Sequence, residues 1–242
     1  MNIVEVKNLT KKYKQLKAVD NISFNVAKGE IFALIGPNGA GKSTTLKILA
    51  SVLMPTKGEV LVNKLDMNNE GKEIRKVITY LPEEAGAYKN MSGNAYLSLM
   101  ANLYTDFPNE AVGFIEYAKR ICGLGDRLKE KVSSYSKGMV RKLLLARAIM
   151  SRPVLAILDE PTSGLDIINA MQIRDIIKSL SKEGMSVLLS SHNMLEIEYL
   201  SDRVGIMNNG KIIEIGTPKG LKKEYKANNL EEVFVKLTTL DK

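Results

Sequence analysis

Apolar and polar positions alternate along the opening third of the chain in the way expected of β-strands. Ile22, Phe24 and Val26 are separated by polar residues, and this period of two predicts a strand with one buried face. Residues 31–35 form an unbroken apolar run, Ile-Phe-Ala-Leu-Ile, which is typical of a strand covered on both faces of a parallel sheet. We therefore expect this third to be mainly β-structure.

The hydrophobic period becomes helical between residues 92 and 151. The first helix expected there follows a capping serine, Ser92, and its apolar face comprises Tyr96, Leu97, Met100, Leu103 and Tyr104. The second helix carries Phe114, Ala118 and Ile121 and ends at Gly123 and Gly125. Together they predict a helical subdomain inserted into an α/β core.

Strand patterns return after this block. Apolar runs at 154–158 and 186–190 flank a helical stretch at 173–180, and an Asn-Gly pair at 209–210 predicts a hairpin. Strands that alternate with helices predict a mostly parallel sheet, with functional residues at the carboxyl ends of the strands. A last stripe at helical spacing predicts a helix packed on its own domain; it comprises Leu230, Val233, Phe234 and Leu237.

Composition narrows the class of protein. The 242 residues are 45% hydrophobic and 26% charged, which is enough for one substantial core and excludes general disorder. No stretch approaches the roughly 18 consecutive apolar residues of a membrane span, and the N-terminus has no apolar signal core, so a cytosolic protein is expected. The single Cys122 and single His192 exclude an internal disulfide and a histidine-rich metal site.

The net charge of +8 is spread along the chain. Such a balance fits an ordinary solvated surface, or a mild attraction to anions in which an inner membrane face is favoured over DNA.

The clearest chemical motif is Gly-Pro-Asn-Gly-Ala-Gly-Lys-Ser at residues 36–43, which fills the pattern G-x-x-x-x-G-K-[ST]. It follows the buried run 31–35 and precedes a helical run at 44–50. Its glycines allow backbone N–H groups to surround phosphate oxygens at a helix N-terminus. Lys42 can then reach the β and γ phosphates, and the Ser43 hydroxyl can bind Mg²⁺. A looser match would be a plain glycine turn before a helix, but this context predicts nucleotide binding.

A second motif, Asp159-Glu160, ends the apolar run 154–158. Beside a phosphate loop, the aspartate suits a Mg²⁺ ligand, direct or through water, and the glutamate suits the group that orients or deprotonates the attacking water. By contrast, residues 63–66 spell Asn-Lys-Leu-Asp, which imitates a guanine-reading motif. They come before the acidic pair instead of after it, so a turn is predicted.

A third set of residues distinguishes this chain from other phosphate-loop enzymes. Ser136 and Gly138 precede a helical run at 140–150 and would present a second helix N-terminus to an anion. Residues 163–166, Ser-Gly-Leu-Asp, closely follow the acidic pair. His192 ends the next buried run, where it can contact a γ-phosphate or the attacking water.

Over essentially its whole length the chain resembles the nucleotide-binding domain of the ATP-binding cassette (ABC) family. The resemblance implies an α/β fold: a P-loop NTPase core with a mostly parallel sheet, an antiparallel β subdomain and an inserted α-helical subdomain. It also implies ATP and Mg²⁺ as ligands. The residues implied to bind nucleotide are Tyr13 (stacked on adenine), Gly36, Pro37, Asn38, Gly39, Ala40, Gly41, Lys42, Ser43, Thr44, Ser136, Gly138 and Asp166. Those implied in catalysis are Glu160, His192 and Glu83, and those implied at the metal are Ser43, Asp159 and Glu83.

Three residues depart from the family pattern. Glu83 stands where a glutamine is usual, so it keeps an oxygen for Mg²⁺ but adds negative charge. Lys137 and Met139 replace a glycine and a glutamine of the family signature. The form Tyr-Ser-Lys-Gly-Met at 135–139, together with residues 230–237, is most similar to bacterial exporter ATPases for drugs, antibiotics and peptides.

In this family two cassettes enclose two ATP molecules, each signature completing the other subunit's site. The implied partners are a second nucleotide-binding subunit, either the same chain or a paralogue, and separate transmembrane permease subunits that dock near the helices after Glu83. The location implied is the cytoplasmic face of a bacterial membrane, without nucleic acid. The parts expected are 1–83 with 153–220 (core), 84–152 (helical signature subdomain) and 221–242 (C-terminal extension). The alternatives are a soluble ABC-type ATPase acting on a non-transport macromolecule, and a non-enzymatic switch, which Glu160 and His192 disfavour.

Overall fold

The computed structural model describes residues 1–239, in which ten strands form two sheets. The last three residues of the predicted extension 221–242 lie outside that range. In the larger sheet β9, β3, β8, β7 and β6 run parallel, and β10 is antiparallel to β9. In spatial order its strands are β10 (Lys211–Gly216), β9 (Arg203–Asn208), β3 (Ile31–Ile35), β8 (Ser186–Ser191), β7 (Leu155–Asp159) and β6 (Ile78–Leu81). The predicted mostly parallel sheet is confirmed.

The smaller sheet is antiparallel, with the strands β2 (Leu16–Ala27), β1 (Asn2–Tyr13), β4 (Lys57–Val62) and β5 (Leu65–Asp66) in that order. The alternation read from the sequence holds, because Ile22, Phe24 and Val26 are all buried on β2. The Asn-Lys-Leu-Asp tetrad begins with the predicted turn, in which Asn63 and Lys64 are both left-handed, and its last two residues form the short strand β5. Asp66 then caps α2 (Met67–Val77), a helix that the sequence patterns did not predict.

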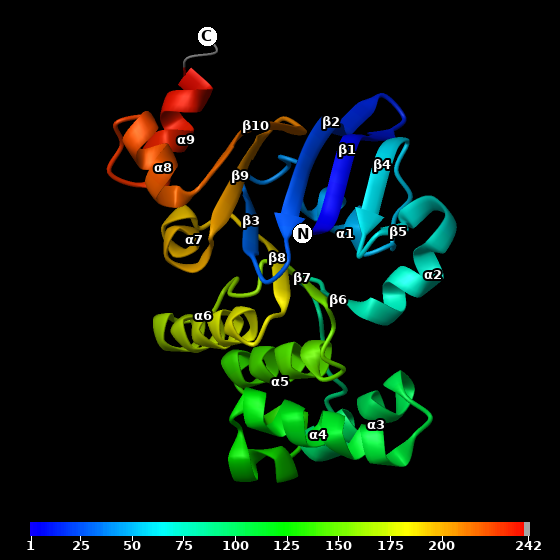
Figure 1. Ribbon diagram of the computed structural model, residues 1–242. Coiled ribbons are helices and arrows are strands. Elements are labelled where there is room, and N and C mark those ends of the chain that lie inside the picture. Colours follow the sequence, from blue (N-terminus) through cyan, green and yellow to red (C-terminus); the bar gives the residue numbers. More distant parts are fainter. Residues whose placement is uncertain (240–242) are drawn as a thin grey trace.

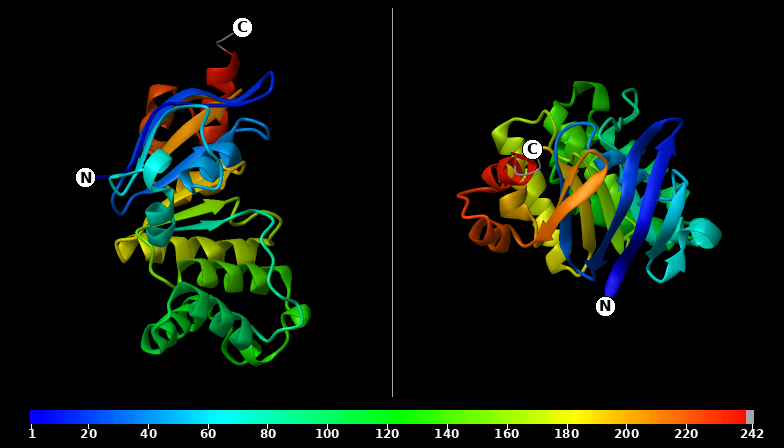
Figure 2. Two further views of the ribbon diagram at one scale, coloured as in Figure 1. Left: turned by 90° about the vertical axis from the view of Figure 1, so that its right-hand side faces the viewer. Right: turned by 90° about the horizontal axis from the view of Figure 1, so that it is seen from above.

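The parallel sheet is the middle of three layers (Figures 1 and 2). One face of β3, with Ile31, Ala33 and Ile35, packs against the helical layer, and the other face, with Phe32 and Leu34, packs against the antiparallel sheet. This explains the unbroken apolar run: both faces of the strand are covered. The helices α5 (Lys137–Ile149), α6 (Ile167–Lys182) and α7 (Met194–Leu200) pack on the sheet from the helical layer, and α1 (Lys42–Leu49) packs on its other face, together with the antiparallel sheet.

The inserted helical block lies at the end of the molecule away from the antiparallel sheet (Figure 1). It contains α3 (Gly93–Tyr104), α4 (Pro108–Cys122) and two 3₁₀ turns, Gly125–Lys129 and Val132–Ser134. Ser92 caps α3 by accepting a hydrogen bond from Ala95, as predicted. The predicted apolar face of this helix is wrong at its end, however: Leu103 is 72% exposed and Tyr104 is 42% exposed. The buried stripe instead continues from Leu97 to Ala101, and a residue two positions further on points about 200° away.

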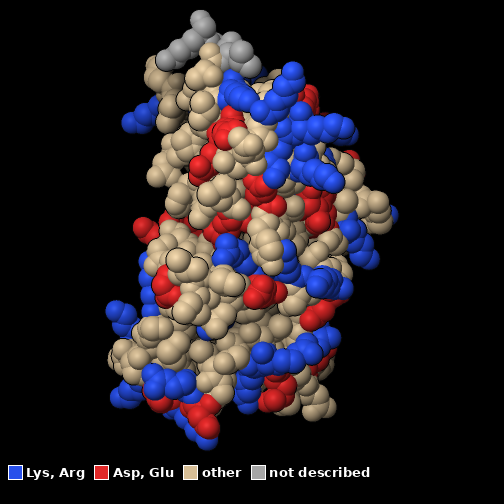
Figure 3. Space-filling view, turned by 90° about the vertical axis from the view of Figure 1, so that its left-hand side faces the viewer, with Lys and Arg blue, Asp and Glu red and all other residues tan. Residues whose placement is uncertain are grey.

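The C-terminal part adds α8 (Pro218–Glu224) and α9 (Leu230–Thr239), which packs on α7. Leu230 and Val233 are fully buried, so the last stripe packs on its own domain as predicted. No helix within residues 1–239 has both the length and the apolar character of a membrane span. On the face shown in Figure 3, acidic side chains are interspersed among the basic ones.

Candidate functional site

The phosphate loop leaves the carboxyl end of β3 and enters α1 in a conformation that requires glycine. Gly36 and Gly41 have φ values of 149° and 103°. A Cβ atom at Gly36 would overlap the carbonyl oxygen of Met207, and one at Gly41 would overlap that of Ala18. The backbone therefore passes close to neighbouring chain segments at both positions, which only glycine permits.

Lys42 opens α1 and is only 6% exposed. Its ammonium donates hydrogen bonds to the carbonyl oxygens of Gly36 (2.7 Å) and Pro37 (3.2 Å), so it folds back over the loop. Burial lowers the pKa of Lys42, and the nearby carboxylates of Glu160, Asp159 and Glu83 oppose that shift. A desolvated cation held over a loop of N–H groups is suited to binding phosphate oxygens.

Asp159 ends β7 beside this loop and accepts hydrogen bonds from three hydroxyls. Ser43 (3.0 Å) and Ser190 (2.6 Å) donate to Oδ1, and Tyr80 (3.3 Å) donates to Oδ2. Burial, together with the charge of Asp159, raises the pKa of Tyr80 above its ordinary range, so the phenol stays a donor. The sequence patterns did not find Ser190 or Tyr80, although Ser190 stands in the buried run just before His192.

Two oxygen-bearing side chains at this strand end are suitable ligands for Mg²⁺. The Ser43 hydroxyl and the Asp159 carboxylate are hard oxygen ligands, and they are already adjacent.

Glu160 follows Asp159 and is held from several sides. Its backbone is left-handed (φ 48°), and its N–H donates to the Ser190 hydroxyl at 3.1 Å. One carboxylate oxygen lies 4.0 Å from the Lys42 ammonium, and the other lies 2.9 Å from Nδ1 of His192. The carboxylate is 8% exposed and the His192 side chain 55%. The structure thus brings together three predicted residues from distant parts of the chain.

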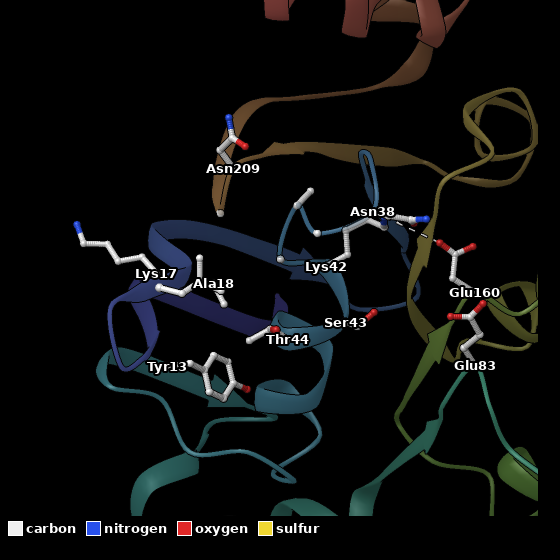
Figure 4. Close-up of a pocket in the computed structure, with 15 residues that line it drawn as sticks. Tyr13, Lys17, Ala18, Asn38, Lys42, Ser43, Thr44, Glu83, Glu160 and Asn209 are labelled. Atoms are coloured by element: carbon white, nitrogen blue, oxygen red, sulfur yellow. Dashed lines mark ion pairs between the residues drawn. The ribbon is translucent and has the colours of Figure 1, made fainter.

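A cavity of about 470 Å³ lies over the loop, a volume within the usual range for ligand sites. Tyr13 lies toward one end of it, and Glu160 and Glu83 lie at the other, with the phosphate loop between them (Figure 4). The ring of Tyr13 is partly exposed and contacts the Lys11 ammonium, 5.2 Å from its centroid. Five further lining residues were not predicted: Leu16, Lys17, Ala18, Asn209 and Gly210.

Glu83 is fixed by two contacts. Its Oε1 accepts a hydrogen bond from Ser163 (3.0 Å), and its backbone carbonyl accepts one from Arg141 of α5 (2.9 Å). The loop that carries Glu83 is therefore tied both to α5 and to the segment after Glu160.

The remaining predicted residues lie elsewhere. Ser136, Gly138 and Asp166 do not line the cavity over the phosphate loop. Ser136 caps α5, and Asp166 caps α6 by accepting hydrogen bonds from the backbone and the side chain of Asn169, which lower the pKa of Asp166. Gly138 packs directly against the Asn169 side chain, leaving no room for a Cβ. One chain therefore presents two separate groups of predicted residues.

A glycine loop between a buried strand and a helix, with an acidic strand end beside it, is the architecture of a P-loop nucleoside triphosphatase. The family model described as ABC transporter matches residues 19–163. The chain is 36% identical to the lantibiotic transport ATP-binding protein SrtF of Streptococcus pyogenes, over 96% of each chain. It is 38% identical to the bacitracin transport ATP-binding protein BcrA of Bacillus licheniformis, over 88% of this chain and 69% of that one. The chain belongs to the ABC transporter family, as an ATP-binding subunit and ATPase.

Solved structures agree with this assignment. An ATP-binding subunit of an ABC transporter superimposes with a TM-score of 0.85 at 29% identity, covering 98% of this chain and 99% of that one. The dimeric ATP-binding cassette MJ0796, in a post-hydrolysis state with ADP and phosphate, shares the fold with a TM-score of 0.79 at 24% identity, over 88% of this chain and 98% of that one.

Proposed function

We propose that this chain hydrolyses ATP to drive export of an antibiotic, peptide or drug through separate transmembrane permease subunits. The names of SrtF and BcrA, which specify lantibiotic and bacitracin transport, support this class of cargo. They also favour transport over the alternative, a soluble ABC-type ATPase that acts on another macromolecule. The observation that carries the enzymatic part is Glu160, a buried carboxylate between the Lys42 ammonium and the His192 ring.

In this proposal Tyr13 stacks on adenine and the residues from Gly36 to Thr44 surround the phosphates. Lys42 exchanges its carbonyl partners for oxygens of the β and γ phosphates. Ser43, Asp159 and Glu83 would hold Mg²⁺, and the bound ion would neutralise phosphate charge.

Glu160 accepts a proton from the attacking water as that water bonds to the γ-phosphorus and the bond to the ADP oxygen breaks. His192, whose Nδ1 lies 2.9 Å from Oε2 of Glu160, holds the orientation of this carboxylate.

A second cassette completes the site. Ser136, Gly138 and Asp166 lie away from the cavity of their own chain, which supports their use by a partner, either a second copy or a paralogue. A helix N-terminus carries partial positive charge, so the γ-phosphate attracts the α5 terminus of the partner. Hydrolysis and phosphate release remove this attraction, and the pair opens.

We assign one role to each of the three regions expected from the sequence. Residues 1–83 and 153–220 bind ATP, 84–152 carry the signature, and 221–242 form a C-terminal extension. The loop of Glu83, tied to α5 through Arg141, supports the neighbouring helical block as the docking region for the permease subunits. Docking there places the chain on the cytoplasmic face of the membrane. On the face shown in Figure 3 the interspersed charge supports a partner other than nucleic acid for that face.

The test compares three substitutions in the purified chain with Mg²⁺ and ATP. Glu160→Gln removes the proton acceptor but keeps the shape, so we expect ATP binding to persist, turnover to fall by about 10²–10⁴-fold, and an ATP-dependent dimer to accumulate on gel filtration. Lys42→Ala removes a cation from the phosphates and weakens ATP binding. Glu30→Gln is the control, because Glu30 is equally buried (7% exposed) but pairs with Arg203.

Wild-type turnover in Glu160→Gln would remove Glu160 from catalysis. Unchanged ATP affinity in Lys42→Ala would remove Lys42 from phosphate binding. For the transport role, the chain is purified from detergent-solubilised membranes, where a hydrophobic permease subunit is expected to co-purify. Recovery of the chain without such a subunit would contradict that role.

A further inference from the structure

Two chain segments that leave neighbouring parallel strands are bridged twice. Residues 160–166 follow β7, residues 192–196 follow β8, and Asp159 pairs with Ser190 at the strand ends. The first bridge is the contact between Glu160 and His192 described above. The second lies further along the same two segments: the Thr162 hydroxyl donates to Oε2 of Glu196 at 2.8 Å. All four of these residues line one cavity of about 310 Å³.

Glu196 is a buried carboxylate that the proposed reaction does not use. It is 6% exposed and does not line the cavity over the phosphate loop. Its Oε1 faces Nε of Arg174 on α6 at 3.9 Å, and its backbone N–H donates to the Asn193 side chain that caps α7. Burial raises the pKa of Glu196, so keeping a carboxylate here is costly to the fold. An apolar residue would not carry this cost, which points to a role in holding the segments.

Glu160 needs such support. A left-handed backbone at a non-glycine residue is strained and persists only where surrounding contacts hold it. Ser190 holds the N–H of Glu160 and His192 its carboxylate. The hydrogen bond between Thr162 and Glu196 restrains the chain two residues after Glu160. Its acceptor, Glu196, lies on α7, the helix that follows His192.

We infer that Thr162 and Glu196 are positioning residues for the hydrolytic site: their hydrogen bond fixes the separation of the two segments that present Glu160 and His192. This inference rests on the roles proposed above for those two residues. Hydrogen bonds to charged groups are stronger than neutral ones, so the bond between Thr162 and Glu196 is suited to fixing the separation of the two segments. The more exposed contact between Glu160 and His192 depends on that separation.

The experiment deletes one hydroxyl. Thr162→Val keeps the side-chain volume and removes the hydroxyl donor. Thr162→Ser keeps that hydroxyl. The control is Thr105→Val, because Thr105 makes the same contact with Glu110 (2.6 Å) in the distant helical block. The assays are kcat, ATP affinity and the ¹⁵N and ¹³C resonances of the His192 ring, which are unambiguous because the chain has one histidine.

We expect Thr162→Val to lower kcat by about 10- to 100-fold, as a small displacement of reacting groups does, with ATP affinity retained and the His192 resonances shifted. Thr162→Ser should restore both kcat and the resonances, and Thr105→Val should change neither. If Thr162→Val fails to fold by circular dichroism, Glu196→Met, which removes the acceptor of the same hydrogen bond, is measured in its place with the same expectations.

A kcat equal to that of wild type, or unmoved His192 resonances, would overturn the inference. Glu160→Gln is assayed in parallel. If that variant retains turnover, the proposed role of Glu160 fails; if it is inactive while Thr162→Val is fully active, only the positioning role fails.

Discussion

Within residues 1–239, Ser190 is the one hydroxyl that hydrogen-bonds to both Asp159 and Glu160, so its removal gives a quantitative test of how these residues are held. The residue is fully buried on β8. Its hydroxyl donates to Asp159 at 2.6 Å and accepts from the N–H of Glu160 at 3.1 Å. Ser190→Ala therefore removes a hydrogen bond to a carboxylate and leaves a buried N–H without its acceptor.

Losing a bond to a charged group costs about 1.5–3 kcal/mol, and an unsatisfied buried N–H about 1–3 kcal/mol. Asp159 keeps its contacts with Ser43 and Tyr80 in this variant. We therefore expect Ser190→Ala to lower the free energy of unfolding by about 3 kcal/mol, which lies in the lower half of the sum of these two costs. For a chain of this size that lowers Tm by about 6–12 °C. The assay is urea and thermal unfolding followed by circular dichroism.

Ser186→Ala is the matched control. Ser186 is equally buried on the same strand, but its hydroxyl makes one hydrogen bond within the described part of the chain, accepted from the N–H of Gly29 at 2.9 Å. We expect Ser186→Ala to lower the free energy of unfolding by about 1 kcal/mol. If both alanine variants lost the same stability, the contact with the Asp159 carboxylate would contribute nothing measurable, and the reasoning above would be refuted.

Three further results are expected. Tyr80→Phe should raise the Mg²⁺ concentration needed for MgATP binding by about 10-fold, the value of one hydrogen bond to a charged group, while ATP binding in EDTA is unchanged. Tyr117→Phe removes a similar bond, from α4 to the Glu183 carboxylate at the end of α6, and should leave both unchanged in the same titrations. Gly41→Ala should abolish nucleotide binding in an equilibrium assay, since the added methyl overlaps a backbone carbonyl, and wild-type affinity would contradict the loop geometry. The folded-state pKa of Glu196 lies above its unfolded value of 4.5, so its protonated form stabilises the fold below that pH and this contribution is lost as pH rises through the folded pKa. Glu196→Gln cannot ionise, so urea unfolding should show it gaining stability relative to wild type as pH rises above 4.5; a difference independent of pH would contradict the burial cost.

The sequence determined the local parts of this protein. The glycine spacing of residues 36–43, the serine before α3 and the Asn-Gly hairpin at 209–210 each specify backbone geometry within a few residues, and each is present as predicted. The apolar run 31–35 also predicts its strand correctly, because a strand that is buried on both faces has no polar position.

The tertiary structure decided which distant residues meet. Ser190 and Tyr80 carry no motif of their own, and they reach Asp159 only because β8 and β6 flank β7 in the sheet. The exposed Leu103 shows the same limit in a helix, since periodicity alone does not say which part of a long apolar face is covered. Chain-local rules act over a few residues, whereas strand order and helix packing are properties of the whole core. The separation of Ser136 and Gly138 from the cavity over the phosphate loop therefore could be seen only once that core was assembled.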